Sequence, residues 1–235
     1  MICTAMKKIY LFIFCLLGLF SQAQFNGFNM KYEVLDPNTA GKIFRNPIST
    51  ANRPEGQPYL VPAFQWAKIE RVNQKARMRY NVYADEFEFI TPKNDTLILD
   101  KLSDFSPIFL GEPEVKYVLT TYTHRSGKNH TGYLIERHTE GNFTLYCKEN
   151  ISFYDGKTAK TTLETSRPAK YVKAAETFYL KKEKVGIFEF PSTKKQLIQL
   201  FPSQKEQIED YFKQHPLDLK QPNDRLELMA FLNGL

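Results

Sequence analysis

Short runs of β-branched and aromatic residues, separated by turn-forming residues, recur over residues 58–190. Runs bounded by Gly, Asn or Asp, where a tight turn needs a positive φ, are typical of β-strands. The separators are too short for the crossovers that parallel strands require, so the pattern predicts an antiparallel β domain built mostly as a meander. The predicted strands are AKIERV, RMRYNVY, EFEFI, DTLILD, EVKYVLTTYTH, TGYLIERH, NFTLYCKE, ISFY, KYVKAAETFYLK and KVGIFEF.

Aromatic residues lie on both faces of several predicted strands. In NFTLYCKE, for example, Phe143 and Cys147 share one face while Tyr146 lies on the other. A strand with apolar side chains on both faces belongs to a sheet that is curved or covered on both sides. A sandwich and a half-barrel both satisfy this pattern, and the sequence leaves the choice open.

The hydrophobic period changes to that of a helix in residues 191–235. Three short amphipathic helices are predicted, each too short to be stable alone. They are therefore expected to pack on the sheet, on one another or on a partner, which makes the fold mainly β and α+β overall. The predicted boundaries are a cap at Ser192, a stop at Pro202, a capping box of Ser203 and Glu206, a start at Asn223 or Asp224, and a stop at Asn233 and Gly234.

The first 23 residues read as a secretory signal peptide, with cleavage after Ala23. Two lysines precede an apolar run from Ile9 to Phe20, which is shorter than the roughly 20 residues that a membrane-spanning helix needs. An exported protein without a transmembrane helix is therefore predicted. Met6 is an alternative start, and whether the first five residues are translated stays open. Residues 24–57 are rich in Asn, Pro and Gly and are predicted to be extended.

Cysteine content and charge narrow the possibilities further. Removal of the predicted leader leaves Cys147 as the single cysteine, so a packed core, and not disulfides, must stabilise the domain. The formal net charge is +6 for the whole chain, and the leader carries two of the lysines. The charges are interspersed, whereas nucleic-acid binding needs a concentrated basic footprint, so no nucleic-acid partner is expected.

The densest group of acids lies in RMRYNVYADEFEF at residues 77–89. Apolar residues alternate in one phase up to Ala84 and in the opposite phase from Phe87, which indicates a bend or bulge between them. Asp85 and Glu86 are then expected to point to solvent at the bend, with Glu88 on the outer face. A catalytic pair would instead need one buried acid with a raised pKa. The residues predicted to be buried in the first of the two strands are Met78, Tyr80 and Val82.

Histidines and the cysteine supply the other candidates for chemistry. His124, His130 and His138 lie close in sequence, but no motif adds the further ligand that a zinc site needs, so exposed hairpin histidines are favoured. Cys147 and His138 could form a nucleophile–base dyad across a turn. An apolar face raises the pKa of a thiol, however, and this favours a buried structural cysteine. No GxSxG, GxGxxG or P-loop motif is present in the sequence, and no cofactor is predicted.

The leader MKKIYLFIFCLLGLFSQAQ resembles those of secreted Bacteroidota proteins. Residues 56–92, with GQPYLVPAFQW and RYN before an Asp-Glu bend, and the helical tail at 192–235 resemble a group of uncharacterised envelope proteins of that phylum. The resemblance implies the periplasm or the periplasmic face of the outer membrane, and carries over no activity. It also makes Thr96, in Asp-Thr-Leu, a candidate O-glycosylation site.

The resulting functional hypothesis is a non-catalytic, exported envelope protein that binds a protein partner as an accessory subunit of an outer-membrane or periplasmic complex. The high aromatic content, 14% of the chain, suits a partner-covered sheet as well as a core. An alternative from another class is a carrier of a small ligand or lipid in an aromatic-lined β cavity. A third is a hydrolase that uses Asp85, Glu86 or Glu88.

Overall fold

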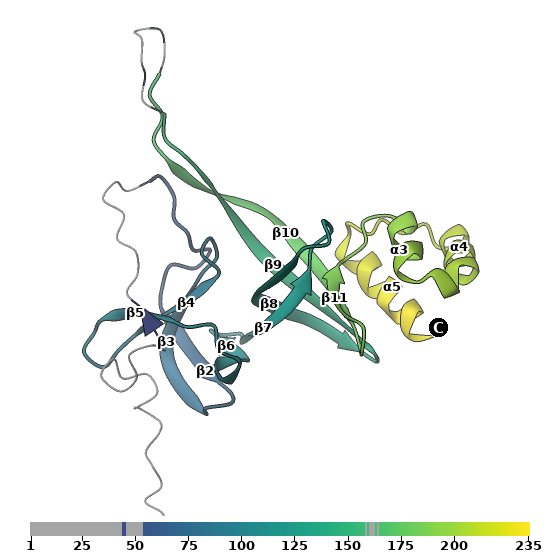
Figure 1. The fold of residues 1–235 in the computed structure, drawn as a ribbon, viewed down its shortest axis with the longest axis horizontal. Helices are drawn as coiled ribbons and strands as arrows, with labels where there is room; N and C mark the ends of the chain where they lie inside the picture. The colour runs from purple at the N-terminus through teal and green to yellow at the C-terminus, as the bar shows by residue number, and fades with distance from the viewer. Residues whose placement is uncertain (1–43, 46–53, 158, 160–162, 164) are drawn as a thin grey trace, which may run out of the picture.

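The computed structural model describes residues 44–45, 54–157, 159, 163 and 165–235 (Figure 1). The predicted signal peptide and most of the predicted extended segment lie outside these residues. Within them, eleven strands form one sheet. The first six strands form an open, antiparallel part of the sheet in the order β1-β5-β4-β3-β2-β6. Their bounds are β1 Phe44–Arg45, β2 Gln65–Ile69, β3 Gln74–Asn81, β4 Glu86–Ile90, β5 Thr96–Leu99 and β6 Ile108–Leu110, with a 3-10 turn at Ser103–Phe105.

The last five strands close into a ring. β7 pairs with β6, β8 and β11, and β8–β9–β10–β11 follow in antiparallel order, so the parallel contact between Phe188 and Thr123 joins the last strand to the first. The predicted mainly β, mostly antiparallel fold is confirmed, and β7 belongs to both parts. The bounds are β7 Val115–Thr123, β8 Asn129–Glu140, β9 Phe143–Tyr154, β10 Lys170–Lys182 and β11 Gly186–Glu189.

The interior of the ring is a small cluster with one buried side chain from each of its strands. Burying apolar surface on the inner face is what favours closure of the sheet. The rings of Tyr122 and Tyr179 lie 4.7 Å apart, centroid to centroid. The five residues, from β7 to β11, are Tyr122, Leu134, Tyr146, Tyr179 and Ile187.

Three helices pack on one face of the ring, as predicted (Figure 1). They are α3 Lys194–Leu200, α4 Lys205–Gln214 and α5 Pro222–Asn233, with a 3-10 turn at Pro202–Gln204 before α4. Leu197, Ile208 and Leu228 of the helices are fully buried in one cluster with Leu145 and Leu180 of the strands.

The predicted caps of the first two helices were wrong. Thr193, and not Ser192, caps α3 by accepting from the Gln196 N–H at 3.3 Å. α4 starts after Gln204 without a side-chain cap, because a 3-10 turn occupies the place of the predicted capping box. α5 begins at Pro222, slightly earlier than predicted, since proline is well suited to the first turn.

Strand boundaries also differ from prediction in two places. NFTLYCKE and ISFY form one continuous strand, β9, and the short strand β6 was missed. The bend between β3 and β4 is confirmed, and Met78, Tyr80 and Val82 are buried as predicted. The orientation of Asp85 at that bend is different from the prediction.

Candidate functional site

Asp85 lies in the turn between β3 and β4 with a φ of 58°, and its side chain is 19% exposed. The carboxylate accepts from the Tyr80 hydroxyl at 2.5 Å and from Lys101 Nζ at 2.7 Å, and it forms an ion pair with Lys148. The expectation that Asp85 points to solvent was therefore wrong. The left-handed residue turns the carboxylate inward, toward a buried lysine that the sequence pattern did not connect with it.

The Asp85–Lys148 pair lies at the point where β8 and β9 separate, which we call the fork. β8 pairs with β9 as far as Ile135 opposite Cys147, and the preceding part of β8 pairs with β7 instead. At the fork, Asp85 accepts from the backbone N–H of Tyr133 at 3.2 Å, and Lys148 Nζ donates to the Tyr133 carbonyl at 3.0 Å. These bonds replace the ladder bonds that are lost where the strands separate.

The charges of Asp85 and Lys148 are matched by each other and by hydrogen bonds. Lys148 also donates to the Tyr80 hydroxyl at 3.1 Å. Burial lowers the pKa of the Lys148 ammonium, and the neighbouring Asp85 carboxylate opposes that shift. A buried cation with a carboxylate and two oxygen acceptors is a satisfied structural ion pair, so we interpret this cluster as architecture.

Glu88 lies on the face opposite the core residues Phe87 and Phe89, as predicted, but that face is covered and Glu88 is only 2% exposed. Its carboxylate accepts from Arg79 Nη2 at 2.6 Å and Nε at 2.8 Å, and from the Tyr59 hydroxyl at 2.7 Å. The Arg79 guanidinium lies 4.1 Å from the ring centre of Tyr59 and 4.4 Å from that of Phe64. Residues before β2 thus cover this face of the sheet. Glu86 is half-buried at the start of β4.

The structure brings two of the three histidines together. The rings of His124 and His130 lie 6.2 Å apart at the β7–β8 turn, and His124 is 3.4 Å from Glu189. His138 instead contacts Glu140 at 3.3 Å. Among the described residues, no group of three His, Cys, Asp or Glu side chains could hold a metal ion.

Cys147 is fully buried and reduced, in agreement with the favoured structural interpretation. Its strand partner is Ile135, whereas His138 lies opposite Leu145 after a bulge in the β8–β9 pairing. Burial raises the pKa of the thiol to about 12, which makes the thiolate a minor species at neutral pH. Thr96, the candidate glycosylation site, is the half-buried first residue of β5.

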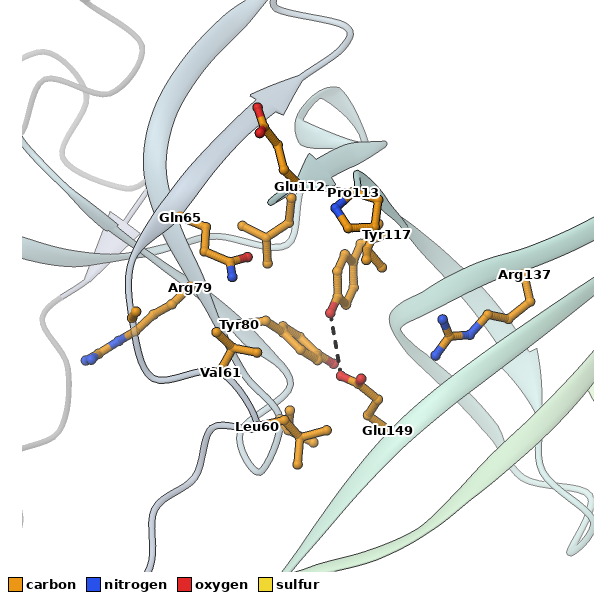
Figure 2. A pocket seen from close by; sticks show the side chains of 14 residues that line it. Leu60, Val61, Gln65, Arg79, Tyr80, Glu112, Pro113, Tyr117, Arg137 and Glu149 are labelled. Carbon is orange, nitrogen blue, oxygen red and sulfur yellow. Dashed lines mark hydrogen bonds between the residues drawn. The ribbon is translucent and has the colours of Figure 1, made fainter.

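A cavity of about 240 Å³ lies between the open part of the sheet and β9 (Figure 2). Figure 2 shows Tyr117 and Glu149 facing each other, with a hydrogen bond of 3.5 Å from the hydroxyl to the carboxylate, and Arg137 beside them. Burial raises the pKa of Glu149, and Arg137 partly opposes this. The cavity is smaller than the roughly 300–1,000 Å³ of pockets for drug-sized ligands. It gives the lipid-carrier alternative no support.

The most exposed part of the sheet is a two-stranded arm, formed by Glu149–Tyr154 of β9 and Lys170–Ala174 of β10 (Figure 1). The first six residues of β9 are buried, and burial then falls steadily until Tyr154 is 54% exposed. The face of the arm toward the β3–β4 turn carries Phe153 and Tyr171, which contact Tyr83. The opposite face, with Tyr154 and Val172, is exposed to solvent.

The two edges of the arm differ. The N–H of Tyr171 donates to the Glu55 carbonyl at 2.9 Å, so a short extended segment of the same chain already pairs with the edge of β10. Because backbone groups alternate along a strand, this bond fixes which residues of β9 point away from β10. They are Glu149, Ile151 and Phe153, and within the described residues no strand pairs with this side of β9 beyond Cys147.

A scan of protein-family models, a search of curated proteins and a search of solved structures each returned no match for this chain. Among the described residues, no helix has the length and apolar character required to cross a membrane. Function must therefore be argued from the geometry of the chain itself.

The arm is not predicted from the sequence, because the predicted strands NFTLYCKE and ISFY are separated at Asn150. The sequence does contain a signal for one continuous strand, since no Gly or Pro separates NFTLYCKE from ISFY. The pairing of Asp85 with Lys148 left no local signal, because the two residues are 63 positions apart.

Proposed function

We propose that this chain is a non-catalytic, exported envelope protein that binds a protein partner through the open edge of β9 in the arm. The observation that supports this most is the row of outward-facing backbone groups at Glu149, Ile151 and Phe153, which no described strand covers. An open edge can accept an added strand from another chain, a common mode of peptide recognition. Two of the three acids considered for catalysis, Asp85 and Glu88, are held in ion pairs.

The edge lacks the devices that protect unpaired strands. Natural edges are shortened, kinked by proline or covered with lysine. β9 has twelve residues, contains no proline, and reads NISFY along its exposed end. The pairing of Glu55 with Lys170 on the opposite edge shows that this ribbon geometrically accepts an extended segment.

The charge of the arm favours an acidic partner. The described residues between positions 149 and 174 include four basic residues and two acids; the basic residues are Lys157, Arg167, Lys170 and Lys173. An extended segment with acidic side chains would be attracted to these positive charges. Such attraction raises association rates and selects among partners. We therefore propose an acidic, extended segment of an envelope protein as the occupant.

Photo-crosslinking in the cells that make this chain tests the proposal. A crosslinking residue replaces Tyr154 on the arm or, as the matched control, Val185, which is 66% exposed in the turn before β11. The expected result is a discrete protein adduct from position 154 only, whose crosslinked peptide is acidic. Equal adducts from both positions, or an adduct to nucleic acid, would contradict the proposal.

A second pair of variants isolates the backbone contact. Ile151→Pro removes one outward N–H while leaving the inward bonds to β10 from Asn150 and Ser152, whereas Ile151→Ala loses the same side chain but keeps the donor. Crosslinking from position 154 is expected to be lost in the proline variant and retained in the alanine variant. Retention in both would show that the partner does not add as a strand.

A further inference from the structure

Arg225, in the first turn of α5, is a buried charge without an acidic partner. The residue is 6% exposed, and its guanidinium lies 3.7 Å from the ring centre of Phe178 on β10. Nη1 donates to the carbonyls of Leu219 at 3.3 Å and Lys220 at 2.8 Å. Nε has no hydrogen-bond partner, and Arg225 forms no ion pair with any described carboxylate.

A buried guanidinium in this state is costly. Arginine stays charged in proteins and presents five N–H donors. The donors that are bonded to carbonyls here are those on Nη1. Burial lowers the pKa of the Arg225 guanidinium, and the electrostatic influence of Cys147, Glu176 and Asp218 opposes that shift. Buried charges are normally paired, and an unpaired one carries a desolvation penalty.

Arg225 lines a cavity of about 340 Å³ between β10, the segment after β11 and the start of α5. Arg125 and Lys220 line the same cavity, but Arg125 is held by Glu189 at 2.8 Å. Glu176 also lines the cavity and forms an ion pair with Arg137, at 3.8 Å. Arg225 and Lys220 are thus the cations available to a ligand.

Apolar side chains also line the cavity and define the stem of the ligand, beside the polar side chains of Thr177 and Ser192 and the Glu189 carboxylate that pairs with Arg125. Phe178, Phe190 and Leu219 line the cavity, and Phe178 stacks under the guanidinium. A planar carboxylate matches the fork of a guanidinium better than a spherical anion does. From this combination we infer that the cavity binds a carboxylate borne on an apolar stem. The inference is independent of the arm.

Two kinds of ligand have a carboxylate on an apolar stem: the carboxyl terminus of a protein chain, and a free aliphatic acid. Isothermal titration of the full chain with N-acetyl-leucine and with hexanoate distinguishes them, with N-acetyl-leucinamide as the uncharged match and inorganic phosphate as the non-planar anion. We expect at least one carboxylate to bind while the amide and phosphate do not. If neither carboxylate binds, or if phosphate binds as tightly as both, the inference is overturned.

Three variants locate the binding. Arg225→Gln is expected to abolish carboxylate binding, and Lys220→Gln, an exposed substitution that leaves the core intact, to weaken it several-fold. Lys213→Gln on α4 removes an equally exposed lysine away from the cavity and is expected to leave affinity unchanged. If Arg225→Gln fails to fold, Lys220→Gln still decides, because unchanged affinity in that variant would contradict the assignment.

Discussion

The two halves of β9 differ in the burial of their side chains and in the pairing of their backbone groups. In the first half, from Phe143 to Lys148, every side chain is buried, and the one charged group is matched by Asp85. In the second half, from Glu149 to Tyr154, burial declines and one backbone edge is open within the described residues. The change comes within a single residue of the fork. A buried charge whose hydrogen-bond and ion-pair partners all lie in the chain stabilises the fold. Polar groups without such partners indicate a binding site for another molecule.

Arg225 extends the same contrast to buried cations. Lys148 has a carboxylate, a hydroxyl and a carbonyl around its ammonium group. Arg225 has two carbonyls on one nitrogen and an unpaired Nε. Both charges are buried, so burial alone does not separate architecture from binding. The hydrogen-bond and ion-pair partners of each cation separate the two cases.

Removal of the carboxylate at the fork is expected to have the largest effect. Asp85→Ala leaves the buried Lys148 ammonium without its counter-ion, and breaking such a pair typically costs about 3 kcal/mol in the free energy of unfolding. Chemical denaturation measures this. The double variant Asp85→Ala with Lys148→Met should be less destabilised than Asp85→Ala alone, since no orphan charge remains. Equal stability of wild type and Asp85→Ala would show that the pair is not structural.

Gly132→Ala tests the close packing at the same fork. A Cβ at this position would lie 2.2 Å from Asp85 Oδ2, so the carboxylate must move away from its partners. The expected loss in unfolding free energy is about 1–3 kcal/mol, as for other overpacked sites. In the background of Asp85→Ala the same substitution should cost much less, because the clashing atom is gone. An additive double mutant would argue against this contact.

High pH is expected to destabilise the fold through its buried tyrosines. Burial raises the pKa of Tyr122 and Tyr146 to about 12 in the folded state, from an ordinary value of 10.0. Their contribution to stability is full below the unfolded value and is lost as pH rises through the folded one, because the unfolded chain releases its protons first. Lys148, whose pKa is lowered, contributes in the opposite direction but is a single group. Unfolding free energy should therefore fall above about pH 10. Stability that rises through that range would contradict the assignment.

Substitutions on the exposed face of the arm should have the smallest effect on stability. Val172→Lys changes a side chain that is 39% exposed, and surface substitutions of this kind usually alter the free energy of unfolding by less than about 0.5 kcal/mol. The matched substitution Leu180→Lys, further along the same strand, places a charge at a fully buried position and should prevent folding. A large loss from Val172→Lys would mean that this face is part of the core.

Local patterns predicted the elements better than the contacts between them. Alternation in RMRYNVY predicted a buried face, and the phase slip predicted the bend, because both depend on neighbouring residues. The orientation of Asp85 depends on Lys148, which is distant in sequence, so period alone placed this acid in solvent. Period placed Glu88 on the correct face, but its burial depends on Tyr59, another distant residue. Ring closure by β11 on β7 likewise depends on a distant contact. Arg225 has no sequence signal, since its significance lies in the partners that it lacks.

Amide hydrogen exchange along β9 in the purified full chain tests the open edge most directly. The account predicts fast exchange at the outward amides of Ile151 and Phe153, and slow exchange at the inward amides of Asn150 and Ser152, which pair with β10. In the crosslinked partner complex, the outward amides should become as slow as the inward ones. If Ile151 and Phe153 are already as protected as Asn150 and Ser152 in the isolated monomer, the edge is covered by the chain itself and the proposed binding mode is contradicted.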